Sequence, residues 1–96
     1  MIVVSITGKG ITVDGHAGYE EPGKDIVCAA VSVLTQNLIK SLNDLTMDSI
    51  EYQIIPGHID IYFKNLSEQG KLLVDSFFVG VSSIIESYGK EYVQIK

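Results

Sequence analysis

The chain has 96 residues, of which 46% are hydrophobic and 20% are charged, so it can form one packed domain over residues 1–96 and is too apolar for a disordered protein. Seven lysines, no arginine and 12 acidic residues give a net charge of −5, which argues against nucleic-acid binding and favours a basic or neutral partner. The single cysteine, Cys28, excludes an intramolecular disulfide and a cysteine-rich zinc site. A lone thiol suits a reducing compartment, and we find neither a targeting segment nor a membrane span, so we expect a cytoplasmic protein without membrane contact.

The first half of the chain predicts a β-hairpin, a loop and a helix. Apolar residues alternate over residues 2–7 and again over 11–14, and the Gly-Lys-Gly sequence between them is typical of a hairpin turn. Glycines and a proline predict a loop over residues 15–24. Asp25 can cap a helix over residues 26–42, where apolar residues recur at steps of three and four.

The second half predicts another hairpin, another helix and a last strand. Residues 50–54 and 58–64 alternate in polarity on either side of a Pro-Gly turn. Ser67 can cap a helix that continues to Tyr88, and residues 92–95 form a short strand. The order ββαββαβ predicts the α+β class, as a two-layer sandwich with two helices packed on a mainly antiparallel sheet.

The second predicted helix is apolar on nearly every side. Five apolar residues lie outside its main stripe: Leu72, Val74, Phe78, Val79 and Ile85. Either both sides pack within one chain or one side forms the surface of a homodimer. We expect a homodimer, because so small a domain gains stability from extra buried area.

Cys28 lies in the first turn of the helix that Asp25 caps. Unpaired backbone N–H groups and the positive end of the helix dipole favour a thiolate there. The same N–H groups are candidates for an oxyanion hole. The small residues Ala29, Ala30 and Ser32 leave room for a peptide beside the thiol. The sequence therefore makes Cys28 a candidate nucleophile.

His16 is the candidate partner of this thiol. It stands at the exit of the second predicted strand, after Gly15, and one loop separates it from Cys28. An imidazole in this place can accept the thiol proton and return it to a leaving amine. Asp14 or Asp25 could orient the imidazole, although Asp25 is also explained as a helix cap.

Three other interpretations of these residues remain open. A lone cysteine is most often a small buried apolar residue, in which case the chain is a non-catalytic dimeric interaction module with a structural Cys. A metal site would use His16, Cys28, His58 and Asp60, of which the last two share a strand face. A redox-sensing thiol would need an intermolecular disulfide, since the chain has no second cysteine. We expect neither a metal nor a cofactor.

The segments GHAGY (15–19) and GKDIVCAAVS (23–32) resemble the signature of the bacterial ribosomal-processing cysteine protease family, Prp. The resemblance extends over essentially the whole chain in length and element order. It implies an endopeptidase that removes a short N-terminal extension from large-subunit ribosomal protein twenty-seven and so supports ribosome assembly. The cut is expected after two aromatic residues and before a small one. The implied nucleophile is Cys28, the implied general base and acid is His16, and the implied assembly is a homodimer.

The resemblance also implies that residues 19–24 order over the bound peptide, and Pro22 is a departure that restricts this ordering. Six further residues are expected to contact the substrate: Gly15, Tyr19, Glu20, Glu21, Asp25 and Ser32. The expected partner is the N-terminal peptide of a ribosomal protein, with no direct contact to nucleic acid. An acidic enzyme should attract such a basic peptide.

Overall fold

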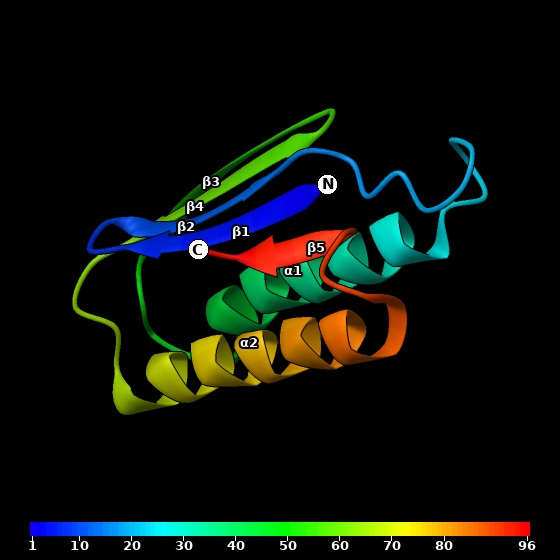
Figure 1. The fold of residues 1–96 in the computed structure, drawn as a ribbon. Helices are drawn as coiled ribbons and strands as arrows, with labels where there is room; N and C mark the ends of the chain where they lie inside the picture. Colours follow the sequence, from blue (N-terminus) through cyan, green and yellow to red (C-terminus); the bar gives the residue numbers. More distant parts are fainter.

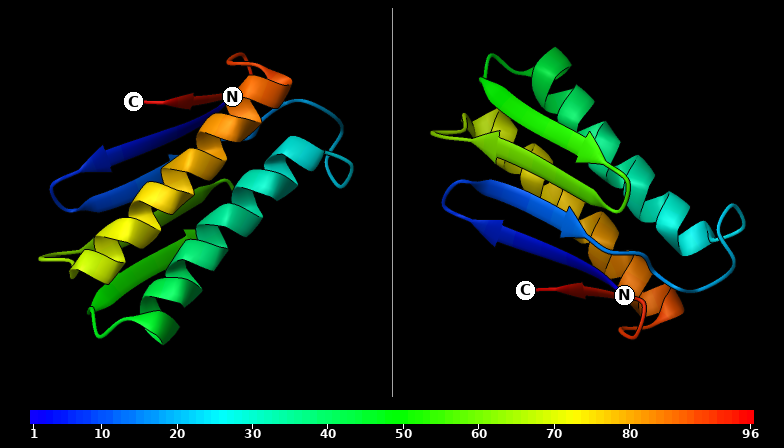
Figure 2. Two further views of the ribbon diagram at one scale, coloured as in Figure 1. Left: turned by 90° about the horizontal axis from the view of Figure 1, so that it is seen from below. Right: turned by 90° about the horizontal axis from the view of Figure 1, so that it is seen from above.

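Two helices lie side by side on one face of a five-stranded sheet, and the other face of the sheet is open (Figures 1 and 2). The computed structural model describes residues 1–96. Its elements are β1 (Ile2–Thr7), β2 (Gly10–Asp14), α1 (Ile26–Leu45), β3 (Ile50–Ile55), β4 (His58–Phe63), α2 (Glu68–Tyr88) and β5 (Val93–Ile95). The predicted α+β class and the order ββαββαβ are confirmed.

The strands of the sheet lie in the order β3-β4-β2-β1-β5. All neighbours are antiparallel except β5, which pairs in parallel with β1. The two hairpins are therefore joined through the central pair β2 and β4, and β3 is left as the long edge strand. Strand order is what brings the β3–β4 turn next to the exit of β2, where Gly15 donates a backbone hydrogen bond to Gly57.

Helix α1 begins where the sequence predicts and ends later. Asp25 is its N-cap, with its side chain accepting from the Cys28 amide. The helix continues to Leu45 rather than ending at 42, because the Thr46 hydroxyl bonds the Leu42 carbonyl and Thr46 then turns the chain into extended backbone. By length and composition alone α1 is apolar enough to cross a membrane, a property shared by core helices of soluble proteins. Here one stripe of it is buried against the sheet and α2.

Packing within the chain accounts for most of the apolar excess on α2. Val74 is buried, and Phe78 and Ile85 pack against the core. Leu72 and Val79 remain exposed on the outer face of the helix. The intramolecular interpretation therefore explains three of the five residues, and only these two remain for a contact with another chain.

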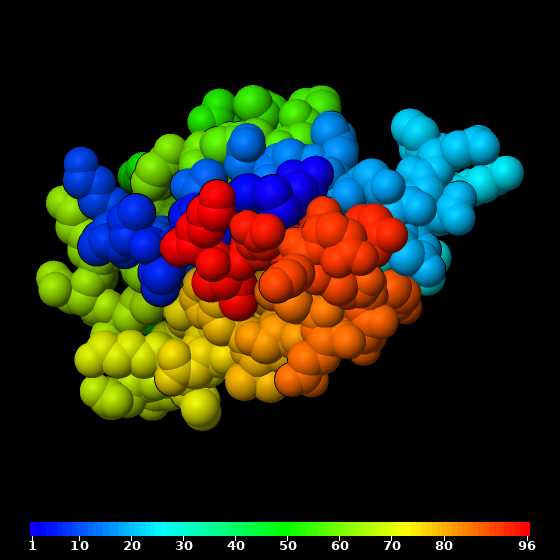
Figure 3. Space-filling view, viewed as in Figure 1, coloured from blue at the N-terminus to red at the C-terminus, as the bar shows by residue number.

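The hydrophobic core contains 17 buried residues drawn from both helices and from every strand except β3. Ala17 belongs to this core and anchors the first part of the loop between β2 and α1, whereas the later part of the loop projects from one end of the molecule (Figure 3). In so small a core each fully buried side chain contributes a large share of the free energy of unfolding, since little else offsets the entropy of folding.

Leu42→Ala and Leu45→Ala test this packing as a matched pair on one helix. Leu42 is 0% exposed and Leu45 is 69% exposed. We expect Leu42→Ala to lower the free energy of unfolding by about 2–5 kcal/mol, the usual effect of a cavity in a core. Leu45→Ala should change it by less than about 0.5 kcal/mol. Urea unfolding followed by circular dichroism measures both, and equal losses would contradict the assigned helix face.

Candidate active site

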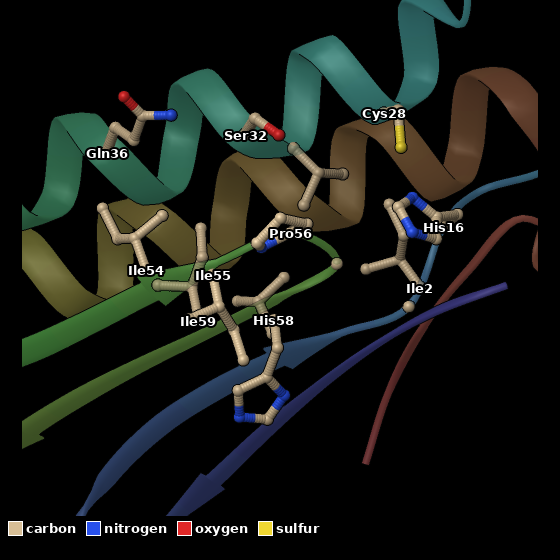
Figure 4. A pocket seen from close by; sticks show the side chains of 14 residues that line it. Ile2, His16, Cys28, Ser32, Gln36, Ile54, Ile55, Pro56, His58 and Ile59 are labelled. Carbon is tan, nitrogen blue, oxygen red and sulfur yellow. The ribbon is translucent and has the colours of Figure 1, made fainter. Parts of the chain in front are cut away.

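A cleft of about 390 Å³ separates the start of α1 from the turn between β3 and β4. Cys28, Ser32 and Gln36 line it from one side of α1. The opposite wall consists of residues 54–59, and His16 and Gly15 close one end. Figure 4 shows these side chains pointing into the space between helix and strands. The cleft therefore brings a thiol, an imidazole and an apolar wall together.

Cys28 and His16 lie at the same end of this cleft, as the sequence predicts. In Figure 4 the sulfur of Cys28 and the ring of His16 point toward one another. Cys28 is half-buried and unpaired, and His16 is exposed. No hydrogen bond joins them in this structure. Catalytic hydrogen bonds are often long in free enzymes and tighten when substrate binds.

Gly57, in the turn between β3 and β4, lies directly against the His16 ring. It has a φ of +74°, and a Cβ atom there would lie 2.8 Å from Nε2 of His16. A Cβ at position 57 would push the ring away from its present place against this turn. The imidazole is thus positioned by a hairpin that is distant in sequence.

Asp25 joins the loop to the helix through three backbone hydrogen bonds. One oxygen accepts from Cys28 N at 2.9 Å, and the other accepts from Tyr19 N at 3.0 Å and Glu20 N at 3.3 Å. Burial raises the pKa of Asp25, but the backbone bonds from Cys28, Glu20, Tyr19 and Val27 outweigh it, so the pKa lies below its ordinary value. Asp25 is therefore held as a carboxylate.

This arrangement corrects the expectation of free amides at the helix start. The N–H of Cys28 bonds the Asp25 carboxylate, and the N–H of Ala29 bonds the Asp25 carbonyl at 3.0 Å. These groups satisfy the helix cap. These two N–H groups are therefore not available to an oxyanion.

The loop residues predicted to contact substrate fall into two sets. Glu20 and Asp25 line a second hollow of about 660 Å³, which adjoins the cleft at Cys28 and Ser32. Tyr19 lines neither space, because its ring packs edge-on against Tyr88 at 5.4 Å and against Tyr92 at 5.1 Å. Tyr19 thus ties the loop to the end of α2.

Glu21 likewise lines neither hollow, and its carbonyl accepts the backbone N–H of Lys24. The expected contact of Glu21 with the substrate stays a prediction, which rests on its negative charge. The loop side of the site is acidic through Glu20 and Asp25, whereas the hairpin side is apolar.

His58 belongs to a different cluster from the one proposed as a metal site. Its ring points away from the cleft in Figure 4 and bonds Asp14 through Nδ1 at 2.7 Å and Asp60 through Nε2 at 2.9 Å. The bonds to Asp14 and then to Asp60 raise the pKa of His58, because both carboxylates stabilise the imidazolium. The groups His16, Cys28, His58 and Asp60 therefore do not converge on one metal position.

Neither candidate carboxylate orients His16. Asp14 is occupied by His58, and Asp25 is occupied by backbone amides. Neither Asp14 nor Asp25 therefore acts as the third member of a Cys-His-Asp triad. The ring is held by packing on Gly57 and by the backbone bond from Gly15 to Gly57.

Sequence reasoning missed the whole hairpin wall of the site. Ile54, Ile55, Pro56 and Gly57 face α1 across the cleft, and Gln36 extends the helical side by one turn beyond Ser32. The Pro-Gly pair predicts a turn, but its neighbour in space depends on the pairing of β4 with β2. The i, i+4, i+8 spacing of Cys28, Ser32 and Gln36 was the available signal for the helical side.

Comparison with known proteins decides the family of this chain. The sequence pattern described as cysteine protease Prp matches residues 1–94. The chain belongs to the Prp family of cysteine proteases. Within Prp, a ribosomal processing cysteine protease from Staphylococcus aureus is 31% identical over 99 aligned positions, which cover 94% of this chain and 93% of the relative.

Solved Prp structures share the fold described above. The crystal structure of an essential ribosomal processing protease Prp from S. aureus, in complex with a covalently linked product peptide, superposes with a TM-score of 0.92 at 27% identity and covers 100% of this chain and 98% of the other. A Streptococcus mutans protein superposes with a TM-score of 0.80 at 30% identity and covers 100% of this chain and 92% of the other. The match over full length confirms the fold.

Asp25→Asn tests the carboxylate that joins loop and helix. An amide can still cap the helix through its oxygen, but its NH₂ group cannot accept from Tyr19 and Glu20. The lowered pKa means that Asp25 contributes stability above its ordinary value of 3.8, and that this contribution is lost as pH falls through the folded pKa. We expect the variant to be less stable than wild type near pH 7 and the difference to shrink below about pH 4. Urea unfolding over this pH range measures it, and a difference independent of pH would contradict the assignment.

Gly57→Ala tests the contact of this turn with the imidazole, with Gly18→Ala as its control. Both glycines have a similar positive φ, +74° and +70°, so an alanine strains the backbone equally. Only at Gly57 would the new Cβ meet His16, whereas Gly18 has open space. We expect the His16 ring resonances in NMR spectra to shift in Gly57→Ala and to remain close to wild type in Gly18→Ala. Equal shifts would mean that backbone strain alone moves the ring.

Proposed function

We propose that this Prp protein removes a short N-terminal extension from large-subunit ribosomal protein twenty-seven, with Cys28 as nucleophile and His16 as general base and acid. The observation that supports the proposal is the shared cleft of Cys28 and His16 in a chain that belongs to a cysteine protease family. Relatives named ribosomal processing cysteine protease support the class of substrate.

The proposed reaction has two steps. His16 takes the proton of Cys28, and the thiolate attacks the scissile carbonyl carbon. His16 then gives that proton to the leaving amine as the C–N bond breaks, and the acyl group stays on sulfur. In the second step His16 activates a water molecule that hydrolyses the thioester and restores the thiol.

Ser32 is the group of the cleft best placed to bind the carbonyl oxygen. It lies one turn after Cys28, lines both hollows and donates no hydrogen bond within the chain. A donor of this kind contributes about 10²–10³ in rate in acyl-transfer enzymes. The amides of Cys28 and Ala29 bond Asp25 instead.

The charge distribution supports a basic peptide as substrate. The chain has a net charge of −5, and Glu20 and Asp25 stand on the loop side of Cys28. Opposite charge raises the association rate and makes it fall with added salt. A homodimer in the cytoplasm completes the proposal, with the exposed Leu72 and Val79 on α2 as candidate contacts.

Cys28→Ala and His16→Ala test the proposed mechanism on a peptide that spans the extension and the mature N-terminus. We expect no cleavage by Cys28→Ala and a rate lowered by about 10²–10⁴ in His16→Ala, the usual contribution of a general base. His58→Gln is the matched control: the residue lines the cleft, but its ring points away from Cys28 and bonds Asp14 and Asp60, so the variant should cleave at nearly the wild-type rate. Mass spectrometry of the products reads the result. Cleavage by Cys28→Ala would reject Cys28 as the nucleophile. No cleavage by the wild type, with Cys28 inert toward iodoacetamide, would favour the non-catalytic interaction module.

A further inference from the structure

The edge strand β3 leaves apolar side chains uncovered on the helix side of the sheet. Ile54 pairs with Ile59 and Tyr52 pairs with Ile61, and both partners in β4 are buried. Ile54 and Tyr52 point to the same side as these partners, yet they are 49% and 56% exposed. An open trough with an apolar β3 wall therefore lies between β3 and α1, where Ile54 lines the same cavity as Ser32 and Gln36 (Figure 4).

The backbone of β3 is also free on its outer side. The strand has six residues and pairs only with β4, so the N–H and C=O groups of alternate residues point outward without a partner strand. Edge strands are commonly protected by a lysine or a proline within them. The sequence IEYQII of β3 contains neither, and its one charged residue, Glu51, lies on the face of the sheet away from the helices, so this edge is able to accept another strand.

The trough continues into the active-site cleft. Cys28, Ser32 and Gln36 form one stripe along α1, and Ile54 faces them in the same cavity. Eight helical residues span about 12 Å. An extended peptide rises about 3.3 Å per residue, so about four residues fit between Cys28 and Gln36.

We propose that the substrate peptide binds as a sixth strand along the outer edge of β3, with alternate apolar side chains in the trough between β3 and α1. This inference rests on the proposed function, because it assigns how a peptide reaches Cys28. A peptide, rather than a second copy of the chain, is the occupant because the trough ends at the thiol. The S. aureus Prp with a covalently linked product peptide, at 27% identity over the whole chain, is consistent with such an occupant.

Strand addition makes a specific demand on the bound peptide. Side chains of an extended segment alternate between the two faces of the sheet. Those on the trough side meet Ile54 and Tyr52, and those on the other side meet Gln53 and solvent. The peptide therefore needs apolar residues at every second position. Its backbone N–H groups bond β3 at every second position.

Peptides that attach to Cys28 test this binding mode whatever the natural substrate is. The probes are two tetrapeptides with alternating valine and threonine, one with an N-terminal iodoacetyl group and one with a C-terminal chloromethyl ketone. Each forms a thioether with the thiol and releases halide, so the pair covers both chain directions. We expect one of them, once attached, to slow hydrogen exchange at alternate backbone amides of β3 by at least tenfold. If neither adduct protects β3, the proposal is overturned.

N-methylation of the probe detects strand pairing directly in the wild-type protein. Methylation of an amide that bonds β3 should slow labelling of Cys28 by about fivefold to tenfold, and methylation of the next amide should leave the rate within about twofold. Iodoacetamide, which makes no strand, corrects for the reactivity of the thiol itself. Equal effects at successive amides would overturn pairing with β3.

Ile54→Gln supplies the side-chain test, with Ile6→Gln as its matched control. Both isoleucines lie on strands and are about half exposed, 49% and 48%, but Ile6 is on β1 and outside the cleft. We expect Ile54→Gln to slow labelling by the probe about fivefold relative to iodoacetamide, and Ile6→Gln to have no such effect. Equal rates for the two variants would contradict the trough.

Further outcomes distinguish this binding mode from dimerisation through β3 and from the proposed function. Protection of β3 in the unlabelled protein that grows with protein concentration would assign the edge to a second copy and overturn the proposal. Wild-type cleavage of the ribosomal peptide without β3 protection in either adduct would reject the binding mode and leave the proposed function in place. Protected β3 in the adduct without such cleavage would reject the ribosomal substrate alone.

Discussion

The carboxylate of Asp25 is the interaction on which the active-site end of the molecule depends. It binds the amides of Tyr19 and Glu20 with one oxygen and that of Cys28 with the other. One ionised side chain therefore sets the start of α1, closes the loop that follows His16 and holds the backbone of the thiol residue. Because the Cys28 amide already donates to Asp25, that N–H group is not free for the chemistry at sulfur.

The imidazole side of the site depends on the sheet instead. His16 follows β2 directly, and the pairing of β2 with β4 brings the β3–β4 turn beside it. Gly15 bonds the Gly57 carbonyl, and the bare Gly57 leaves room for the ring. Outside the cleft, His58 joins Asp14 of β2 to Asp60 of β4. Thiol and imidazole thus come from two separately organised parts, a capped helix and a pair of hairpins.

Much of the fold was predictable because it depends on local patterns. Alternation, the Gly-Lys-Gly and Pro-Gly turns, and caps at Asp25 and Ser67 each involve residues within a few positions of one another. The end of α1 was predicted too early, because the cap by Thr46 depends on a hydroxyl that finds the Leu42 carbonyl only in the helix. The packing of Tyr19 on Tyr88 and Tyr92 was not predictable, because these partners lie 69 and 73 residues away in sequence; its contact with substrate stays a prediction.

The sequence by itself determined the element order, the candidate thiol and imidazole, and the family. These depend on residue type and spacing along the chain. Only the tertiary structure decided that the amide of Cys28 serves Asp25, that His58 points away with its two carboxylates, and that β3 and α1 enclose a trough with an apolar β3 wall. The physical reason is that strand order and register are set by the burial of one whole face of the sheet, so no single segment specifies which hairpin will stand opposite Cys28.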